Sequence, residues 1–245
     1  MTSHACEEIA EDESGFPSGR CSCGWETAGC PDDETAMNVL MEHAFRMGSQ
    51  LPAGETILAA TAWPNNAALI ADCRRLGYLP GRVMDVTYGR GKWWTVGGEP
   101  EGLVKHDLRL DGVDFRHLPH PDASFDAIAF DPPYKLNGTP TDKVDAPYGV
   151  DVIDTRDGRH QLIRDGITEC ARVLASGGYL LAKVQDQVNG GKVRWQSRIF
   201  ADHAESLGLE HVDALLMLAY RPQPAGVRQV HARRNYSTLL VFKKP

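Results

Sequence analysis

Short apolar segments that alternate with helical segments constrain the fold of this chain most strongly. The expected strands span residues 82–87, 103–107, 113–116, 127–130, 179–184, 212–219 and 237–242, and the expected helices span 67–76, 161–174 and 194–207. Strands that alternate with helices favour a mainly parallel sheet with helices on both faces. The sequence therefore predicts an α/β protein with a Rossmann-like sheet of seven strands.

The first 50 residues differ from the rest in charge and cysteine content. They hold ten Asp and Glu residues against two Arg and Lys residues, and four of the six cysteines lie among the first 30 residues. Gly48 and Pro52 are typical of a segment boundary. We therefore predict an acidic N-terminal extension over residues 1–50 and a larger domain over residues 51–245.

A candidate zinc site lies in this extension. Its candidate ligands are Cys21, Cys23, Cys30 and His43, because thiolate and imidazole groups are the ligands that zinc prefers. Only one residue separates the first two cysteines, whereas strong zinc signatures have two to four. An acidic tail with unused thiols therefore remains an alternative, and a disulfide is a weaker one.

The distribution of apolar and charged residues bears on location and partners. No run of 18 apolar residues occurs, and the N-terminus is acidic, so the sequence predicts a cytoplasmic protein with neither a membrane span nor a signal peptide. The net charge is −7, yet residues 183–245 hold ten basic and five acidic residues. This basic region is compatible with a polyanionic partner. Its candidate nucleic-acid contacts are Arg221, Arg228, Arg233 and Arg234.

Acidic and glycine residues gather where the expected strands end. Gly89 and Gly91 follow the strand that holds Asp85. Asp107 is the last residue of the expected strand 103–107, and Asp114 lies in the expected strand 113–116. Ligands of such sheets bind beyond the carboxyl ends of the strands. Asp107 could accept hydrogen bonds from the hydroxyls of a ribose, and Asp114 could accept one from an adenine amino group. A glycine turn followed by these two acids therefore predicts an adenosine-containing cofactor. Lys183 and Asp186 also lie near this edge, where a surface ion pair would equally explain them.

The fourth expected strand ends in Asp131-Pro132-Pro133-Tyr134. This tetrapeptide, with the lead-in of residues 124–130, the helix-to-strand turn of residues 169–178 and the final strand of residues 237–243, resembles the class I S-adenosylmethionine-dependent amino-methyltransferases. Those enzymes modify exocyclic nitrogens of nucleic-acid bases. The resemblance covers residues 82–244 and implies that the last strand is antiparallel.

The resemblance also implies which residues contact the cofactor. They are Asp85, Thr87, Tyr88, Gly89, Gly91, Asp107, Asp114 and Phe115. Two features depart from the family pattern. Val86 and Thr87 follow the first acid where the family usually has proline and phenylalanine, and Arg90 replaces a small residue between the glycines.

The tetrapeptide suits methyl transfer to an aromatic amine, whose lone pair is delocalised into its ring. The Asp131 carboxylate and the Pro132 carbonyl, held together by the fixed φ of proline, could each accept one N–H and direct the lone pair at the methyl donor. Tyr134 offers a stacking surface for a flipped base. The predicted substrate is adenine N6 in DNA, and the alternatives are an RNA base (adenine N6 or guanine N2) or a non-catalytic zinc-bearing nucleic-acid-binding protein.

Overall fold

A computed structural model of the chain describes two compact units. Its described residues are 6–11, 17–21, 25–27, 63, 65–136, 155–218, 230–232 and 234–245. One unit comprises Met1–Pro64 and the other Asn65–Pro245. The boundary predicted between residues 50 and 51 lies outside the described residues and stays a prediction.

The described residues of the N-terminal unit include one antiparallel strand pair. Strand β1 (Cys6–Glu11) pairs with β2 (Pro17–Cys21), and Cys6 lies opposite Cys21 in the register. The sequence analysis did not predict these strands.

The C-terminal unit is built on a six-stranded mixed sheet. Its strands are β3 (Val83–Asp85), β4 (Val104–Lys105), β5 (Phe125–Phe130), β6 (Leu174–Val184), β9 (Glu210–Leu218) and β10 (Tyr236–Lys243), in the order β4-β3-β5-β6-β10-β9. The first four of these strands are parallel, whereas β10 lies antiparallel between β6 and β9. The predicted Rossmann-like α/β fold and its antiparallel last strand are confirmed.

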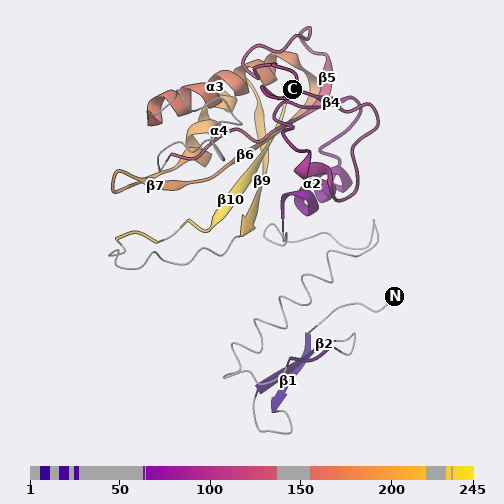
Figure 1. Cartoon of the computed structure of the whole chain (residues 1–245), viewed down its shortest axis with the longest axis vertical. Helices are drawn as coiled ribbons and strands as arrows, with labels where there is room; N and C mark the ends of the chain where they lie inside the picture. The colour runs from indigo at the N-terminus through magenta and orange to yellow at the C-terminus, as the bar shows by residue number, and fades with distance from the viewer. Residues whose placement is uncertain are drawn as a thin grey trace. The chain divides into compact units, whose positions relative to one another are not determined.

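Helices cover both faces of this sheet. Figure 1 shows α3 (Arg156–Val173) and α4 (Gln196–Ser206) on one face and α2 (Asn66–Arg75) on the other. The side-chain oxygens of Asn65 and Thr155 cap α2 and α3 by accepting backbone N–H bonds. Within the described residues, none of the helices is both long and apolar enough to cross a membrane.

Successive side chains of β6 point to opposite faces of the sheet, so the sequence of this strand shows what each face carries. Leu180, Ala182 and Val184 are fully buried in the core that α3 and α4 complete, while Lys183 between them reaches Asn66 of α2. By the same alternation, Asp85 in β3 lies on the α2 face. The α2 face therefore carries polar side chains at the carboxyl ends of the strands.

The strand predicted over residues 113–116 does not form, so the described sheet has six strands instead of seven. Asp111 Oδ1 accepts the backbone N–H of Val113 at 3.2 Å, and Asp114 Oδ1 accepts that of Arg116 at 2.9 Å. These short-range bonds compete with a strand ladder for the same backbone donors. The segment consequently forms turns.

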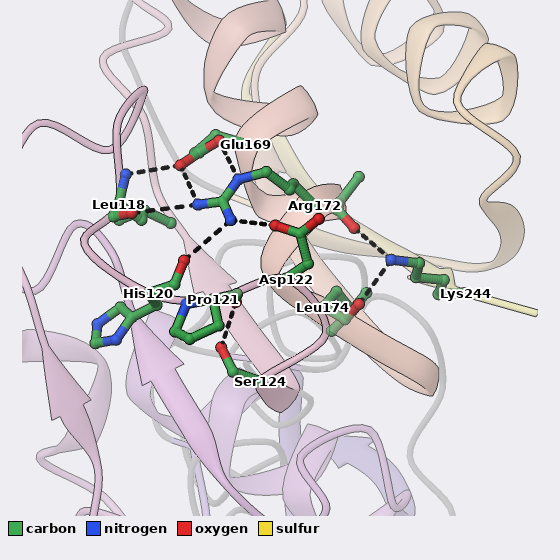
Figure 2. Close-up of polar contacts among 10 residues, drawn as sticks. Leu118, His120, Pro121, Asp122, Ser124, Glu169, Arg172, Leu174 and Lys244 are labelled. Atoms are coloured by element: carbon green, nitrogen blue, oxygen red, sulfur yellow. Dashed lines mark hydrogen bonds and ion pairs between the residues drawn. The ribbon is translucent and has the colours of Figure 1, made fainter.

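Arg172, near the end of α3, fastens the segment before β5 to the helix (Figure 2). Its guanidinium donates to both carboxylate oxygens of Glu169, to Asp122 Oδ1 and to the carbonyls of Leu118 and His120. Glu169 also accepts the backbone N–H of Leu118 at 2.8 Å. Glu169 and Arg172, which belong to the segment that contributed to the family resemblance, thus hold residues 118–122 against α3 just before β5 begins. We call these two residues the α3 clamp.

Arg172→Ala is expected to lower the free energy of unfolding by about 1 to 3 kcal/mol, because it removes several hydrogen bonds at once and leaves Glu169 without its cation. Arg198→Ala is the matched control, since Arg198 forms one exposed pair with Asp202 at 3.6 Å and such pairs contribute little. Chemical denaturation measures both variants. An equal loss of unfolding free energy in both variants would contradict the role of Arg172 in holding residues 118–122.

Candidate active site

Asp85 is the last residue of β3, and its carboxylate is buried at the carboxyl edge of the sheet. Only 3% of Asp85 is exposed. Its Oδ1 accepts the Thr87 backbone N–H at 2.9 Å, and its Oδ2 accepts the indole N–H of Trp94 at 2.8 Å. Burial raises the pKa of Asp85 to about 7, and the nearby charge of Asp131 acts in the same direction.

Asp131 follows β5 directly and lies beside Asp85, because β3 and β5 are adjacent parallel strands. Its Oδ2 accepts the indole N–H of Trp93 at 3.1 Å, and its backbone N–H donates to Thr87 Oγ1 at 2.7 Å. Burial raises the pKa of Asp131 to about 6, although the positive charge of Lys183 and the Trp93 bond oppose this rise. The second carboxylate oxygen, Oδ1, has no such indole donor.

Two adjacent tryptophans thus hold two different acids. They belong to the short 3-10 helix η1 (Lys92–Trp94), which begins after Gly91, and both rings are nearly buried. The sequence analysis missed both residues. The available signal was a Trp-Trp pair directly after the glycine turn, since a tryptophan that becomes buried needs an acceptor for its indole N–H.

Lys183 is the buried cation of this region. It is 1% exposed, its Nζ donates to Asn66 Oδ1, and Met217 Sδ lies 3.8 Å away. Burial lowers the pKa of Lys183 to about 8, and the negative charge of Asp131 opposes that fall. A surface ion pair is therefore the wrong explanation for Lys183, whose charge acts on the site from inside the fold.

The glycine turn and Asp107 lie side by side. Gly89 and Gly91 have φ of 53° and 65°, in the left-handed region that favours glycine. A Cβ built on Gly89 would lie 4.0 Å from Asp107 Oδ2, and Asp107 is 9% exposed. Asp107 Oδ1 accepts the Arg109 backbone N–H at 2.9 Å. The open backbone at Gly89 beside Asp107 Oδ2 suits the hydroxyls of a ribose.

Tyr88 anchors this turn through its backbone. Its N–H donates to the His106 carbonyl at 3.0 Å, and the His106 N–H donates to the Asp85 carbonyl at 2.9 Å. Its phenol donates to Glu99 Oε1 at 2.5 Å, and Lys105 Nζ lies 5.0 Å from its ring centroid. The Tyr88 side chain is thus engaged with the outer strand edge.

Asp114 and Phe115 already have partners in this structure. Both carboxylate oxygens of Asp114 accept from the Arg116 guanidinium, at 2.6 to 3.0 Å. The Phe115 ring packs edge-on against Phe130, with centroids 5.1 Å apart. Contact of these two residues with an adenine ring stays a prediction.

The tetrapeptide itself forms a tight turn at the end of β5. Pro132 and Pro133 are buried and Tyr134 is half-buried. The Tyr134 N–H donates to the Pro132 carbonyl at 2.8 Å, which leaves that oxygen one lone pair. The Tyr134 carbonyl accepts from Gln187 Nε2 at 3.1 Å and from Gln196 Nε2 at 2.9 Å.

Several predicted site residues lie outside the described residues, so their roles stay predictions. They are Cys23, Cys30, His43, Arg221, Arg228 and Arg233, and Cys21 is described only as the last residue of β2. Within the described part of the chain, no group of three or more His, Cys, Asp or Glu residues could hold a metal ion. Arg234 is described, and its guanidinium lies 4.8 Å from the centroid of the Trp195 ring.

The sheet and this edge define a Rossmann-like α/β protein with a glycine turn and buried carboxylates where such folds bind ligands. No protein-family model matches the chain, and no curated protein matches it. Among solved structures, it is similar to TTHA0409 from Thermus thermophilus, provisionally named a DNA modification methylase, at 16% identity and a TM-score of 0.40. That match covers 68% of this chain and 53% of the other, so this chain spans about half the length of that protein.

The same Thermus protein in complex with S-adenosyl-L-methionine matches at 19% identity and a TM-score of 0.38, over 54% of this chain and 51% of the other. A third similar structure is the N-methyltransferase NodS from Bradyrhizobium japonicum, at 12% identity and a TM-score of 0.43. It covers 73% of this chain and 94% of the other.

Proposed function

We propose that this protein is an S-adenosylmethionine-dependent methyltransferase that acts on an exocyclic amine of a nucleic-acid base, with adenine N6 in DNA as the first candidate. One observation carries the proposal: Asp131, the first residue of Asp-Pro-Pro-Tyr, lies at the carboxyl end of β5 beside buried Asp85. The glycine turn and Asp107 lie at the same edge.

The residues at this edge fit the cofactor. Asp107 would accept hydrogen bonds from ribose hydroxyls, and the backbone at Gly89 leaves room for a ligand to approach closely, whereas the Tyr88 phenol fills the corresponding space at Gly91. Thr87 links Asp85 to the tetrapeptide, because its backbone N–H donates to Asp85 and its hydroxyl accepts the Asp131 N–H. When bound, S-adenosylmethionine would supply the electrophilic methyl group.

Asp131 and Pro132 would then activate the amine. Asp131 Oδ1 would accept one amine N–H while Trp93 holds Oδ2, and the remaining lone pair of the Pro132 carbonyl would accept the other N–H. Two such acceptors make the amine nitrogen more tetrahedral, so its lone pair can attack. The product amine must lose a proton, which Asp131, with a pKa of about 6, can take up.

Methyl transfer is therefore expected to depend on an ionised Asp131. Its kcat/KM should fall about tenfold per pH unit below the pKa of about 6. Trp93→Phe removes a donor that lowers this pKa, so the acidic limb of the profile should move to higher pH. Initial rates from pH 5 upward measure the limb.

Trp94→Phe is the matched comparison, since it removes an equally buried indole that donates to Asp85 instead. We expect Trp94→Phe to change the affinity for the cofactor more than it shifts the acidic limb of the pH profile. An acidic limb that stays in place in Trp93→Phe would contradict the assignment of Asp131 as the titrating acceptor.

One assay tests the proposed function against its alternatives. Purified protein is incubated with methyl-labelled S-adenosylmethionine and with DNA or RNA, and the labelled nucleoside is identified after digestion. N6-methyladenine in DNA would support the first candidate, whereas a methylated RNA base would indicate the second. Cofactor binding without transfer to either polymer would favour the non-catalytic binding protein.

The zinc prediction is independent of this chemistry. If Cys21, Cys23, Cys30 and His43 bind zinc, protein purified without a metal-affinity tag should hold one zinc per chain, and Cys21→Ser with Cys23→Ser should lose it. Elemental analysis measures both. A full zinc equivalent in the double variant would rule out these ligands, and no zinc in the wild type would favour the acidic tail.

A further inference from the structure

The hairpin of β7 (Gln187–Asn189) and β8 (Lys192–Arg194) is fastened to the catalytic tetrapeptide. Gln187 donates to the Tyr134 carbonyl and accepts the Leu136 N–H at 3.0 Å, and Asn189 Nδ2 donates to the Leu136 carbonyl at 3.1 Å. Gln196, in the first turn of α4, donates to the same Tyr134 carbonyl. The hairpin and the residue that joins it to α4 therefore have a fixed position beside Tyr134.

That joining residue is Trp195, an exposed aromatic ring. It is 49% exposed, which is unusual for tryptophan and differs from the nearly buried Trp93 and Trp94. The Arg234 guanidinium lies 4.8 Å from the centroid of its ring, within the range of a cation–π contact. Among the described residues, Arg194 Nε and Arg234 Nε are buried without a hydrogen-bond partner.

The charge of this segment complements a polyanion. Residues 187–201 contain Lys192, Arg194 and Arg198 and no Asp or Glu. Because Arg198 pairs with Asp202 just beyond this segment, Lys192 and Arg194 carry the excess positive charge. Aromatic rings flanked by basic side chains are how proteins bind single-stranded nucleic acid, because bases stack on the ring and phosphates pair with the cations.

We propose that Trp195, together with Arg194 and Arg234, forms a stacking platform for a DNA nucleotide that neighbours the target base. This inference rests on the proposed nucleic-acid substrate. A base would stack on the face of Trp195 opposite Arg234, and the two arginines would hold the flanking phosphates. Extrusion of the target base leaves its neighbour with one unstacked face, and the platform would cover that face.

Equilibrium binding of the full chain to a short fluorescein-labelled single-stranded DNA, measured by anisotropy, tests the platform. Trp195→Ala should weaken binding about five- to 140-fold, which corresponds to the loss of one base–aromatic stack. Trp195→Phe keeps a flat ring and should stay within about threefold of wild type. Leu207→Ala, at the other end of α4 and also exposed, is the matched control and should bind as wild type.

The salt dependence of binding separates stacking from charge. Arg194→Gln should reduce the slope of log K against log salt by about 0.7, whereas Trp195→Ala should leave the slope unchanged. Loss of affinity through misfolding would not produce this division between the two variants. Wild-type affinity in Trp195→Ala, or an Arg194→Gln slope equal to that of wild type, would overturn the platform.

The platform and the proposed function can fail separately. With methyl transfer as the readout, Trp195→Ala should raise KM for DNA and leave kcat nearly unchanged. A wild-type chain that methylates DNA while Trp195→Ala has the wild-type KM would retain the function and overturn the platform. A wild-type chain that methylates no polynucleotide, yet binds DNA through Trp195, would overturn the function and support the platform.

Discussion

Asp131→Ala is expected to reduce methyl transfer about a hundredfold or more while S-adenosylmethionine still binds. The variant removes the only charged acceptor that the proposed mechanism gives the amine, and loss of such an electrostatic contact costs about 3 kcal/mol of transition-state stabilisation. The cofactor is assigned instead to Asp107 and the glycine turn. Single-turnover rates with labelled cofactor measure the transfer, and calorimetry measures cofactor binding.

Two further variants sharpen this test. Asp131→Asn keeps the size of the side chain but donates as well as accepts, so it should also be severely impaired. Asp202→Ala removes an exposed acid of α4 that pairs with Arg198, and it should transfer methyl groups as wild type does. Near-wild-type transfer in Asp131→Ala would exclude the proposed mechanism.

Asp107→Ala is expected to weaken S-adenosylmethionine binding about ten- to 140-fold. The carboxylate beside Gly89 is assigned to the ribose, and a hydrogen bond to a charged acceptor contributes about 1.5 to 3 kcal/mol. Isothermal titration calorimetry of the full chain gives the dissociation constant directly.

Asp114→Ala is the informative comparison for Asp107→Ala. Asp114 is already bound on both oxygens by Arg116, so we expect its replacement to affect cofactor affinity less. If Asp114→Ala weakens binding more than Asp107→Ala does, the ribose has been assigned to the wrong acid.

Local patterns in the sequence were sufficient to predict the layered α/β fold. The spacing of apolar residues depends only on the period of helices and strands, so β5, β6 and β10 were expected close to where they form. The left-handed turn at Gly89 and Gly91 was also predictable from the local sequence, because glycine has no side chain and adopts positive φ angles readily. The third predicted strand failed because the carboxylates of Asp111 and Asp114 captured the backbone donors that the strand needed.

The sequence by itself determined which chemical groups reach the carboxyl edge of the sheet: Asp85 ends a strand, and the glycine turn, Asp107 and the Asp-Pro-Pro-Tyr turn each come after one. Only the tertiary structure decided their partners. Trp93 reaches Asp131 across 38 residues, and Lys183 reaches Asn66 across 117 residues. Such pairings arise because burial removes water as an alternative partner, so each polar group must bond whichever donor or acceptor the packing brings within reach.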